Sequence, residues 1–175
     1  MSRHTILSAI GADRPGLVDE VSEFVLARGG SIEDSRMVNL HGQFAIMMSI
    51  GGPPETIDRL EGDLDALRSQ SGIHAELTPA EPTLARAAAT IPFRLTGRAL
   101  DQAGLVHSVA HLLRSLDVNI ESVATTLESA PITGAPIFAM ELIVAVRADT
   151  SVAKLREELA GVCDLLNIDW HLAAL

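Results

Sequence analysis

The residues of this sequence that are best suited to chemistry stand in one short loop, Gly11-Ala-Asp-Arg-Pro-Gly16, ahead of a stretch with helical spacing. The backbone N–H groups at a helix start, with the positive end of the helix dipole, suit a carboxylate. Asp13 is close enough along the chain to receive an ammonium group, and Gly11 permits a bend and close approach of a ligand. The loop therefore fits the two ends of a free amino acid.

Helix capping is the competing interpretation of the same loop. Asp13 can cap the helix, and Pro15 suits a first-turn position because it has no N–H to leave unpaired. The pattern by itself favours capping over a ligand site. A related segment, Gly97–Gly104, keeps an Asp and a Gly but lacks the proline, and we expect its loop to be two residues longer. Two ligand sites, one in each segment, need not be equivalent.

The relation between these two segments extends over most of the chain. Gly16-Leu17-Val18 recurs as Gly104-Leu105-Val106, and Ile32-Glu33 recurs as Ile120-Glu121, both at an offset of 88. The apolar pattern between them recurs at the same offset. We infer two homologous domains, over residues 1–80 and 91–175, joined by a linker over 81–90 with a short helical piece around 84–89.

Each copy has the element order β-α-β-β-α-β, which places the candidate loop between a strand and a helix. Alternating and helical apolar spacing predict these elements, and Thr56 is a plausible N-cap for the second helix. In the first copy the expected elements are 5–10, a helix from Gly16, 31–40, 44–50, a helix from Thr56 through Leu67, and 73–78. In the second copy they are 91–96, 104–116, 119–127, 137–146, 152–163 and 168–172. The fold class is therefore α+β: two ferredoxin-like βαββαβ domains, each a four-stranded antiparallel sheet with two helices on one face.

The second face of each sheet is expected to be covered as well. In the strand Ile137–Val146, Phe138 and every second residue after it should meet the helices, yet the opposite parity is also mostly apolar. A sister domain or a second chain is the expected cover. Arg94 and Glu141 have the parity of this open face, and we expect them to lie within salt-bridge reach.

Composition and spacing argue against catalytic and metal chemistry. His107 and His111 have a metal-compatible spacing but lie opposite the apolar stripe of their helix, with no third ligand placed by the sequence. Cys163 is interpreted as a small core residue, because no partner base is indicated. No catalytic set, metal site or cofactor motif is found, so we expect a protein that is not an enzyme.

The net charge of −10 is shared between residues 1–88, at −6, and residues 89–175, at −4. Neither half supplies the positive surface that nucleic-acid binding or an anionic membrane would need, although Arg3, Arg14, Arg28 and Arg36 leave a basic patch conceivable. No membrane span or signal peptide is found, so we expect a cytoplasmic protein without direct contact to nucleic acid or membrane.

The runs Ile10–Val18 and Ala27–Glu33 resemble the opening of an ACT domain, and Asn119–Glu121 repeats the end of that signature. ACT domains are amino-acid-sensing regulatory modules with this fold. A chain of two ACT copies resembles the glycine cleavage system transcriptional repressor family, whose members are thought to antagonise a LysR-type activator without binding DNA.

The resemblance implies a ligand site made by the loop after the first strand and the start of the second strand, at an interface between two ACT units. The implied contacts are Gly11, Asp13, Gly16, Leu17, Ser31 and Ile32 in the first copy and Asp101, Gly104, Leu105, Asn119 and Ile120 in the second. Asn119 replaces Ser31, and its amide can serve both ends of an amino acid, whereas the missing proline argues against the second copy. Which copy binds therefore stays open.

The residues and the resemblance leave two candidate functions. The first is a regulator that binds a small amino acid, glycine or serine first, needs no cofactor and contacts a LysR-type transcriptional activator. The second is a pure interaction or dimerisation module without a small-molecule ligand, in which the apolar sheet faces form a homodimer or a complex.

Overall fold

The computed structural model describes residues 2–80, 89–131 and 133–175, which form two units, one within residues 1–84 and one within 85–175. The elements of the first unit are β1 (Arg3–Ala12), α1 (Leu17–Ala27), β2 (Ser31–Leu40), β3 (Gln43–Gly52), α2 (Pro54–Gly62), α3 (Leu64–Ser71) and β4 (His74–Ala80). Those of the second are β5 (Thr90–Leu100), α4 (Leu105–Ser115), β6 (Asn119–Ser129), β7 (Pro136–Arg147), α5 (Val152–Leu165) and β8 (Asp169–Ala174).

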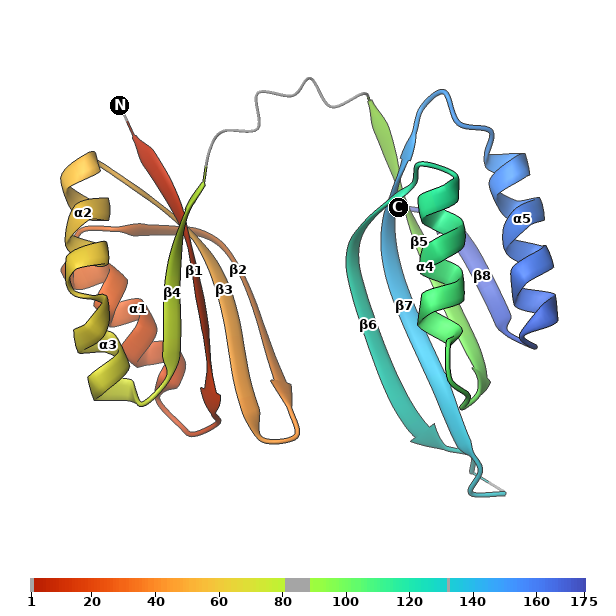
Figure 1. Cartoon of the computed structure of the whole chain (residues 1–175), viewed down its shortest axis with the longest axis horizontal. Coiled ribbons are helices and arrows are strands. Elements are labelled where there is room, and N and C mark those ends of the chain that lie inside the picture. Colours follow the sequence, from red (N-terminus) through yellow and green to blue (C-terminus); the bar gives the residue numbers. More distant parts are fainter. Residues whose placement is uncertain (1, 81–88, 132) are drawn as a thin grey trace. The chain divides into compact units, whose positions relative to one another are not determined.

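Each unit is a four-stranded antiparallel sheet with its helices on one face (Figure 1). The strand orders are β2-β3-β1-β4 and β6-β7-β5-β8. The first and third strands of each copy are therefore central, as the ferredoxin-like order requires. The predicted fold class is confirmed.

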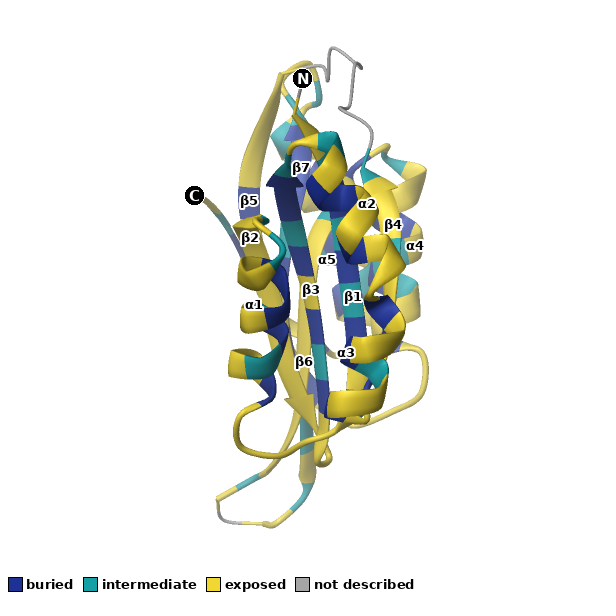
Figure 2. Ribbon diagram, turned by 90° about the vertical axis from the view of Figure 1, so that its left-hand side faces the viewer, coloured by how far each residue is buried: buried dark blue, intermediate teal, exposed yellow. Residues whose placement is uncertain are grey.

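Each unit has its own hydrophobic core between sheet and helices. Along β1 and β3 every second residue is buried, and Figure 2 shows this alternation on β3. The largest buried side chains of the first core include Leu7, Leu17, Phe44, Ile50, Ile57 and Leu60. Those of the second include Leu95, Leu113, Leu142, Leu155 and Leu159. Trp170 of β8, opposite Gly97 of β5, packs against the second core.

The edge strands β2 and β6 differ from the central strands. All ten residues of β2 are exposed, and β6 is exposed except for Ile120. Both strands carry a register shift at the same point, between Ile32 and Asp34 and between Ile120 and Ser122. A bulge at this place re-aims the start of the strand, so the two copies share this irregularity as well as the fold.

The helix that the sequence predicts from Thr56 through Leu67 is divided, which corrects that expectation. It ends at Gly62, and α3 begins at Leu64 after Asp63, which serves α2 as C-cap and α3 as N-cap. The break lets Leu64 enter the core together with the buried residues of α2. Thr56 is not the N-cap: Pro53 takes that position, Pro54 is the first helical residue, and Thr56 is buried inside the helix.

The second sheet has the two faces that were expected of it. Met140, Leu142 and alternate residues after them are buried under the helices. Arg94 and Glu141 lie on the open face with Nε and Oε1 3.8 Å apart, so the predicted pair is confirmed. The cover expected over this face, a sister domain or a second chain, stays a prediction.

The strands extend further than expected at the junction of the two copies. β5 begins at Thr90, and the carbonyl of Ala89 accepts a hydrogen bond from the N–H of Ala148 at 2.8 Å. The helical piece expected around 84–89 lies, except for residue 89, in the stretch 81–88, outside the described residues. None of the helices within the described ranges is long and apolar enough to cross a membrane.

Candidate functional site

The loop between β1 and α1 is tied to the turn between β2 and β3. The N–H of Asp13 donates to the carbonyl of Gly42 at 2.8 Å, and Nδ2 of Asn39 donates to the Asp13 carboxylate at 2.5 Å. The N–H of Gly42 in turn donates to Oδ1 of Asn39 at 3.3 Å. Asp13 therefore bonds across the fold to the hairpin, and Asn39 is a participant that the sequence interpretation missed.

The start of α1 has no side-chain cap among the described residues, so the prediction that Asp13 caps this helix is wrong. Its N-cap is Gly16, whose left-handed backbone has φ +95°, and Pro15 precedes the cap instead of entering the first turn. The helix α4 begins in the same way at Gly104, with φ +94°. By contrast, the Ser151 side chain caps α5. The first N–H groups of α1 and α4 are therefore left to solvent or a ligand, since a helix start has no intrahelical acceptors for them.

Arg14 fixes this loop from its other side. Its guanidinium donates to both carboxylate oxygens of Glu20, at 2.6 and 2.7 Å, and to the carbonyl of Ser71 at the end of α3, at 3.1 Å. The hydrogen bonds of this pair raise the pKa of Arg14 and lower the pKa of Glu20. The loop is thus held between two helices and a hairpin before any ligand arrives.

Two of the predicted contacts have mainly structural roles. Gly11 lies inside β1, and a Cβ there would meet Cγ2 of Ile73 at 2.9 Å, so this glycine allows close packing and not a bend toward a ligand. The side chains of Leu17 and Leu105 are 1% and 2% exposed and belong to the two cores. Only their backbone N–H groups, at the helix starts, are available to a ligand.

The second copy keeps the arrangement of the loop with different side chains. The loops span 13–16 and 101–104, so they are equal in length, and the expected two-residue extension is wrong. In this copy the N–H of Asp101 donates to the carbonyl of Pro136 at 3.0 Å. Gln102 takes the place of Arg14 and donates to the carbonyl of Leu166 at 2.9 Å.

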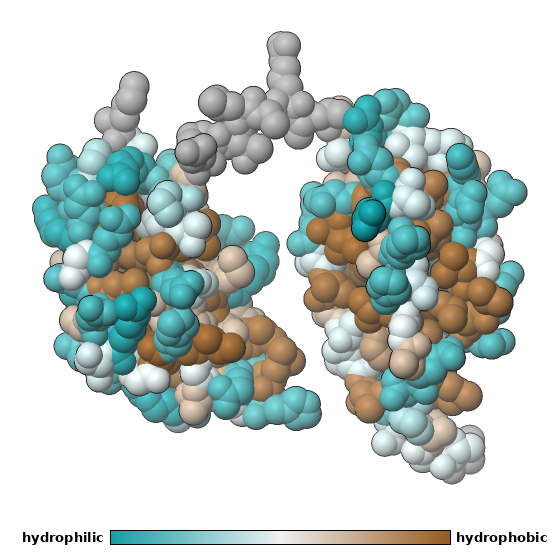
Figure 3. Space-filling model, viewed as in Figure 1, coloured by the Kyte–Doolittle hydropathy of each residue, from teal (hydrophilic) through white to brown (hydrophobic). Residues whose placement is uncertain are grey.

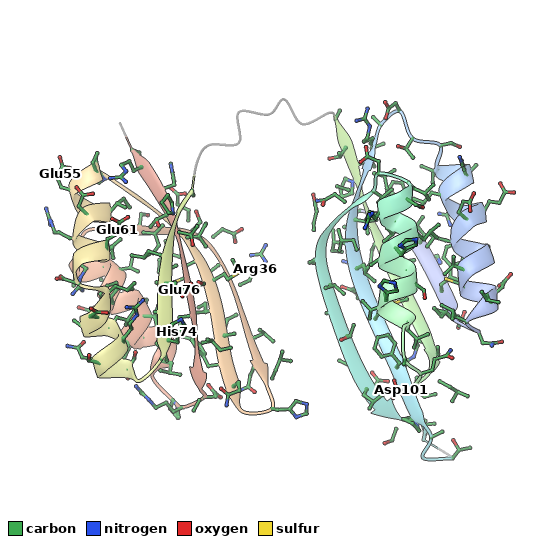
Figure 4. The ribbon with its side chains drawn as sticks, in the orientation of Figure 1. Arg36, Glu55, Glu61, His74, Glu76 and Asp101 are labelled. Atoms are coloured by element: carbon green, nitrogen blue, oxygen red, sulfur yellow. The ribbon has the colours of Figure 1, made fainter. Side chains whose placement is uncertain are left out.

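One difference between the copies changes the chemistry of the aspartate. The residue that corresponds to Asn39 is Leu127, which lies opposite Phe138 as Asn39 lies opposite Phe44. A leucine side chain cannot donate a hydrogen bond, so Asp101 lacks the amide that holds Asp13. Figure 4 labels Asp101 at the loop end of the second unit.

The other predicted contacts lie at the opposite end of each sheet. Residues Ala12 and Leu40 both lie at the Gln43 end of β3, whereas Ser31 lies beside Gly51 at the other end. Asn119 is likewise opposite Ala145, at the far end of β7 from the loop. Within one unit the fold therefore does not bring the loop residues and the strand-start residues together.

A surface groove adjoins each strand start. The groove in the first unit has a volume of about 400 Å³ and is lined by residues of α1 together with Gly30, Ser31 and Ile32. The second has about 390 Å³ and is lined by residues of α4 together with Asn119 and Ile120. Both grooves run between a helix and an exposed edge strand. They leave the strand starts accessible to a neighbouring unit.

The histidine pair, the cysteine and the arginines of the first domain do not add a second site. His107 and His111 are exposed with ring centres 5.9 Å apart, and no group of three metal-binding side chains occurs in the described part of the chain. Cys163 is buried as predicted. Burial, and to a smaller extent the negative charge of Asp164, raise the pKa of its thiol to about 11. Arg3, Arg14, Arg28 and Arg36 pair with the carboxylates of Asp58, Glu20, Asp63 and Asp34, respectively. These pairs remove the basic patch that the sequence left conceivable.

Comparison with known proteins relates the first domain to a family of domains. The ACT domain family model matches residues 3–78. The glycine cleavage system transcriptional repressor of Escherichia coli is 36% identical over 61 residues, which are 35% of this chain and 32% of that protein; the same relation holds for the repressor of Shigella flexneri. The aligned stretch thus spans about a third of these relatives.

Two solved structures share the whole fold. A candidate glycine cleavage system transcriptional repressor is 23% identical, with a TM-score of 0.75 over 100% of this chain and 98% of that one. A protein of unknown function from Galdieria sulphuraria is also 23% identical, with a TM-score of 0.82 over 100% and 99%. At this identity the likeness establishes the fold. Residues 3–78 match the ACT domain family model, the second half repeats the same fold, and the chain is similar to the glycine cleavage system transcriptional repressors over the aligned stretch.

Proposed function

We propose that this protein is a non-enzymatic cytoplasmic regulator that binds a small amino acid, glycine or serine first, between two ACT units. Bound ligand changes its contact with a transcriptional activator, for which a LysR-type protein is the candidate. The observation that carries this proposal is the uncapped, glycine-led start of α1 and of α4, each beside an aspartate. Such a start offers N–H donors to a carboxylate, and the aspartate offers a charge to an ammonium group.

The separation of the two sets of predicted contacts supports a site made by two units. Two ACT units that pair antiparallel through their β2-type edges place the strand start of one unit beside the loop of the other. Ser31 or Asn119 would then complete the site that the partner's loop begins. The long, exposed strands β2 and β6 have the free N–H and C=O groups for such pairing.

We expect the loop of the second copy to be the stronger half of the site. The Asn39 amide already donates a hydrogen bond to the Asp13 carboxylate. Leu127 takes the place of Asn39 in the second copy, so the Asp101 carboxylate is left to solvent or a ligand. Asn119 adds an amide that donates and accepts. These two differences favour binding by the second copy, a choice that the sequence left open.

A thermal-shift screen against the twenty amino acids, followed by calorimetric titration, tests the ligand. A compound that binds only the native protein stabilises it by about 2.7 kcal/mol at a hundredfold excess over Kd. We expect glycine or serine to raise the melting temperature, Asp101→Asn to abolish the shift, and Asp13→Asn to reduce it less. A full panel without any shift at several millimolar would refute the ligand-sensing function.

The regulatory half of the proposal needs a separate measurement. The purified LysR-type activator, bound to its DNA, is titrated with this protein in the presence and absence of the amino acid found above. A ligand-dependent change in the affinity of the two proteins supports the proposal. Equal affinity with and without ligand, or no binding, would contradict it.

A pure interaction module remains the second candidate, favoured by the exposed edges of β2 and β6. In that case Asp101→Asn alters at most stability, and no amino acid changes self-association or partner binding.

A further inference from the structure

The open face of the first sheet carries a groove of about 480 Å³ that is lined by residues of all four strands. Small residues of the central strands, Ser8 and Ala45, form its floor. The larger side chains of Ile10, Met47 and Val38 also line the groove, and they are 51%, 57% and 44% exposed, respectively. Figure 3 shows hydrophobic side chains gathered on the strand side of this unit.

The second domain provides an internal comparison for this face. Strand register matches Ile6, Ile10 and Met47 with Arg94, Arg98 and Glu141, respectively. The same fold therefore tolerates a charge at each of the three positions. Their apolar character in the first domain is not needed by the sheet itself, which indicates that this face is covered by something apolar.

Charges stand on the two rims of the groove, on opposite edges of the sheet. Arg36 of β2 pairs in register with Met47, Met47 with Ser8, and Ser8 with Glu76 of β4. Figure 4 labels Arg36 beside β2, and Glu76 with His74 beside β4. One row across the sheet thus runs from a cation through two central residues to an anion, over about 14 Å at three strand spacings.

This row is complementary to itself, and we propose that the open face of the first domain binds the same face of a second copy of this chain. Two sheets stacked about a two-fold axis parallel to their strands place β2 of one copy over β4 of the other. Arg36 then meets the partner's Glu76, and the pair occurs twice by symmetry. The apolar side chains of the groove meet between the two ion pairs. An axis across the strands would instead place β2 over β2 and Arg36 over its own copy, which like charges disfavour.

The local pairs at the rims do not prevent this exchange of partners. Arg36 contacts Asp34 at 2.6 Å, and His74 contacts Glu76 at 3.1 Å, with most of each side chain exposed to solvent. Exposed pairs of this kind contribute little stability, so they can be extended or replaced at a dimer interface. The arginine also has donors left for a second carboxylate.

The size of the face sets the expected strength of the dimer. Four strands and about three side-chain rows give roughly 400 Å² per copy, from strand spacing and rise. The total of roughly 800 Å² lies below the size of stable complexes and in the range of transient ones. We therefore expect a concentration-dependent equilibrium between monomer and dimer.

Sedimentation velocity of the full chain, from low micromolar to high micromolar concentration, tests the proposal. Met47→Glu and Ile10→Arg install the residue types that the second domain has at the matched positions, so the fold tolerates them. We expect each to weaken the dimer at least tenfold. Ala124→Lys, on the open face of the second domain at the position that matches Arg36 and opposite Glu141, is the control and should leave self-association unchanged.

Charge reversal tests the orientation of the two copies. Arg36→Glu alone and Glu76→Arg alone should each weaken the dimer, and the double variant should restore it. A wild-type chain that is monomeric throughout, a dimer insensitive to Met47→Glu, or a double variant that fails to recover would overturn the proposal. Pairing through the outer edge of β2, as in the proposed function, does not cover Met47 or Ile10, so the two contacts fail independently.

Discussion

Replacing Gly104 by alanine isolates the conformational cost of the left-handed residue that begins α4. Its backbone has φ +94°, and a Cβ built there meets no atom within 4 Å, so no clash contributes to the change in stability. The left-handed conformation costs an L-residue about 1–2 kcal/mol. We expect the free energy of unfolding of the second domain to fall by that amount.

Gly161 in the same domain provides a matched control with the opposite sign. It lies inside α5, with ordinary helical backbone and also with no atom within 4 Å of a built Cβ. Alanine is favoured over glycine by about 1 kcal/mol in a helix interior. Gly161→Ala should therefore stabilise the domain that Gly104→Ala destabilises, although both substitutions add one methyl group.

Urea unfolding followed by circular dichroism, and a parallel thermal melt, measure both changes. For a domain of this size, 1 kcal/mol shifts Tm by about 4–8 °C. We expect Gly104→Ala to lower the Tm of the second domain by at least about 4 °C and Gly161→Ala to raise it by a similar amount. A neutral or stabilising Gly104→Ala would refute the argument that the helix start depends on a left-handed glycine.

Three further results are expected. Cys163, buried and with its pKa raised to about 11, should resist alkylation at pH 8 until the protein unfolds, as mass spectrometry would show; rapid labelling of folded protein would contradict its burial. The hydrogen bond from Arg14 lowers the pKa of Glu20, so the ionised pair stabilises the folded protein at pH values above 4.5, the ordinary pKa of a glutamate. This stabilisation is lost as the pH falls below that value, and Glu20→Gln should flatten the acid dependence of Tm in melts at a series of pH values. Leu113→Ala should cost about 2–5 kcal/mol, because its fully buried side chain lies in the second core; a smaller loss in urea unfolding would indicate that the core closes around the cavity.

The fold was predictable because the same sequence pattern occurs in both copies. Alternating and helical spacing gave the element order, and parity along two central strands was enough to pair Arg94 with Glu141. The division of the second helix was not predictable in this way. Leu64 and Leu67 fit one continuous helical face, and only packing shows that the chain turns at Asp63 to bury them.

The candidate loop lies between a strand and a helix as predicted, but the contacts of its aspartate depend on a distant residue. Asn39 lies 26 residues after Asp13, and only the folded hairpin brings its amide to the carboxylate. Local sequence therefore suggested a helix cap where the structure has a bond across the fold. The predicted difference in loop length was wrong because β1 and β5 extend to residues 12 and 100, beyond the last β-favouring residues of their sequences.

The position of Trp170 gives the molecule a built-in optical label for one half. It is the single tryptophan of a chain without tyrosine, and it packs against the core of the second domain. Fluorescence excited in the tryptophan band therefore reports the state of that domain, while backbone dichroism reports both. Comparing the two signals during one titration or melt assigns an event to a domain without a mutation or a dye. A ligand that delays the tryptophan signal stabilises the second copy, and one that delays the dichroism alone stabilises the first.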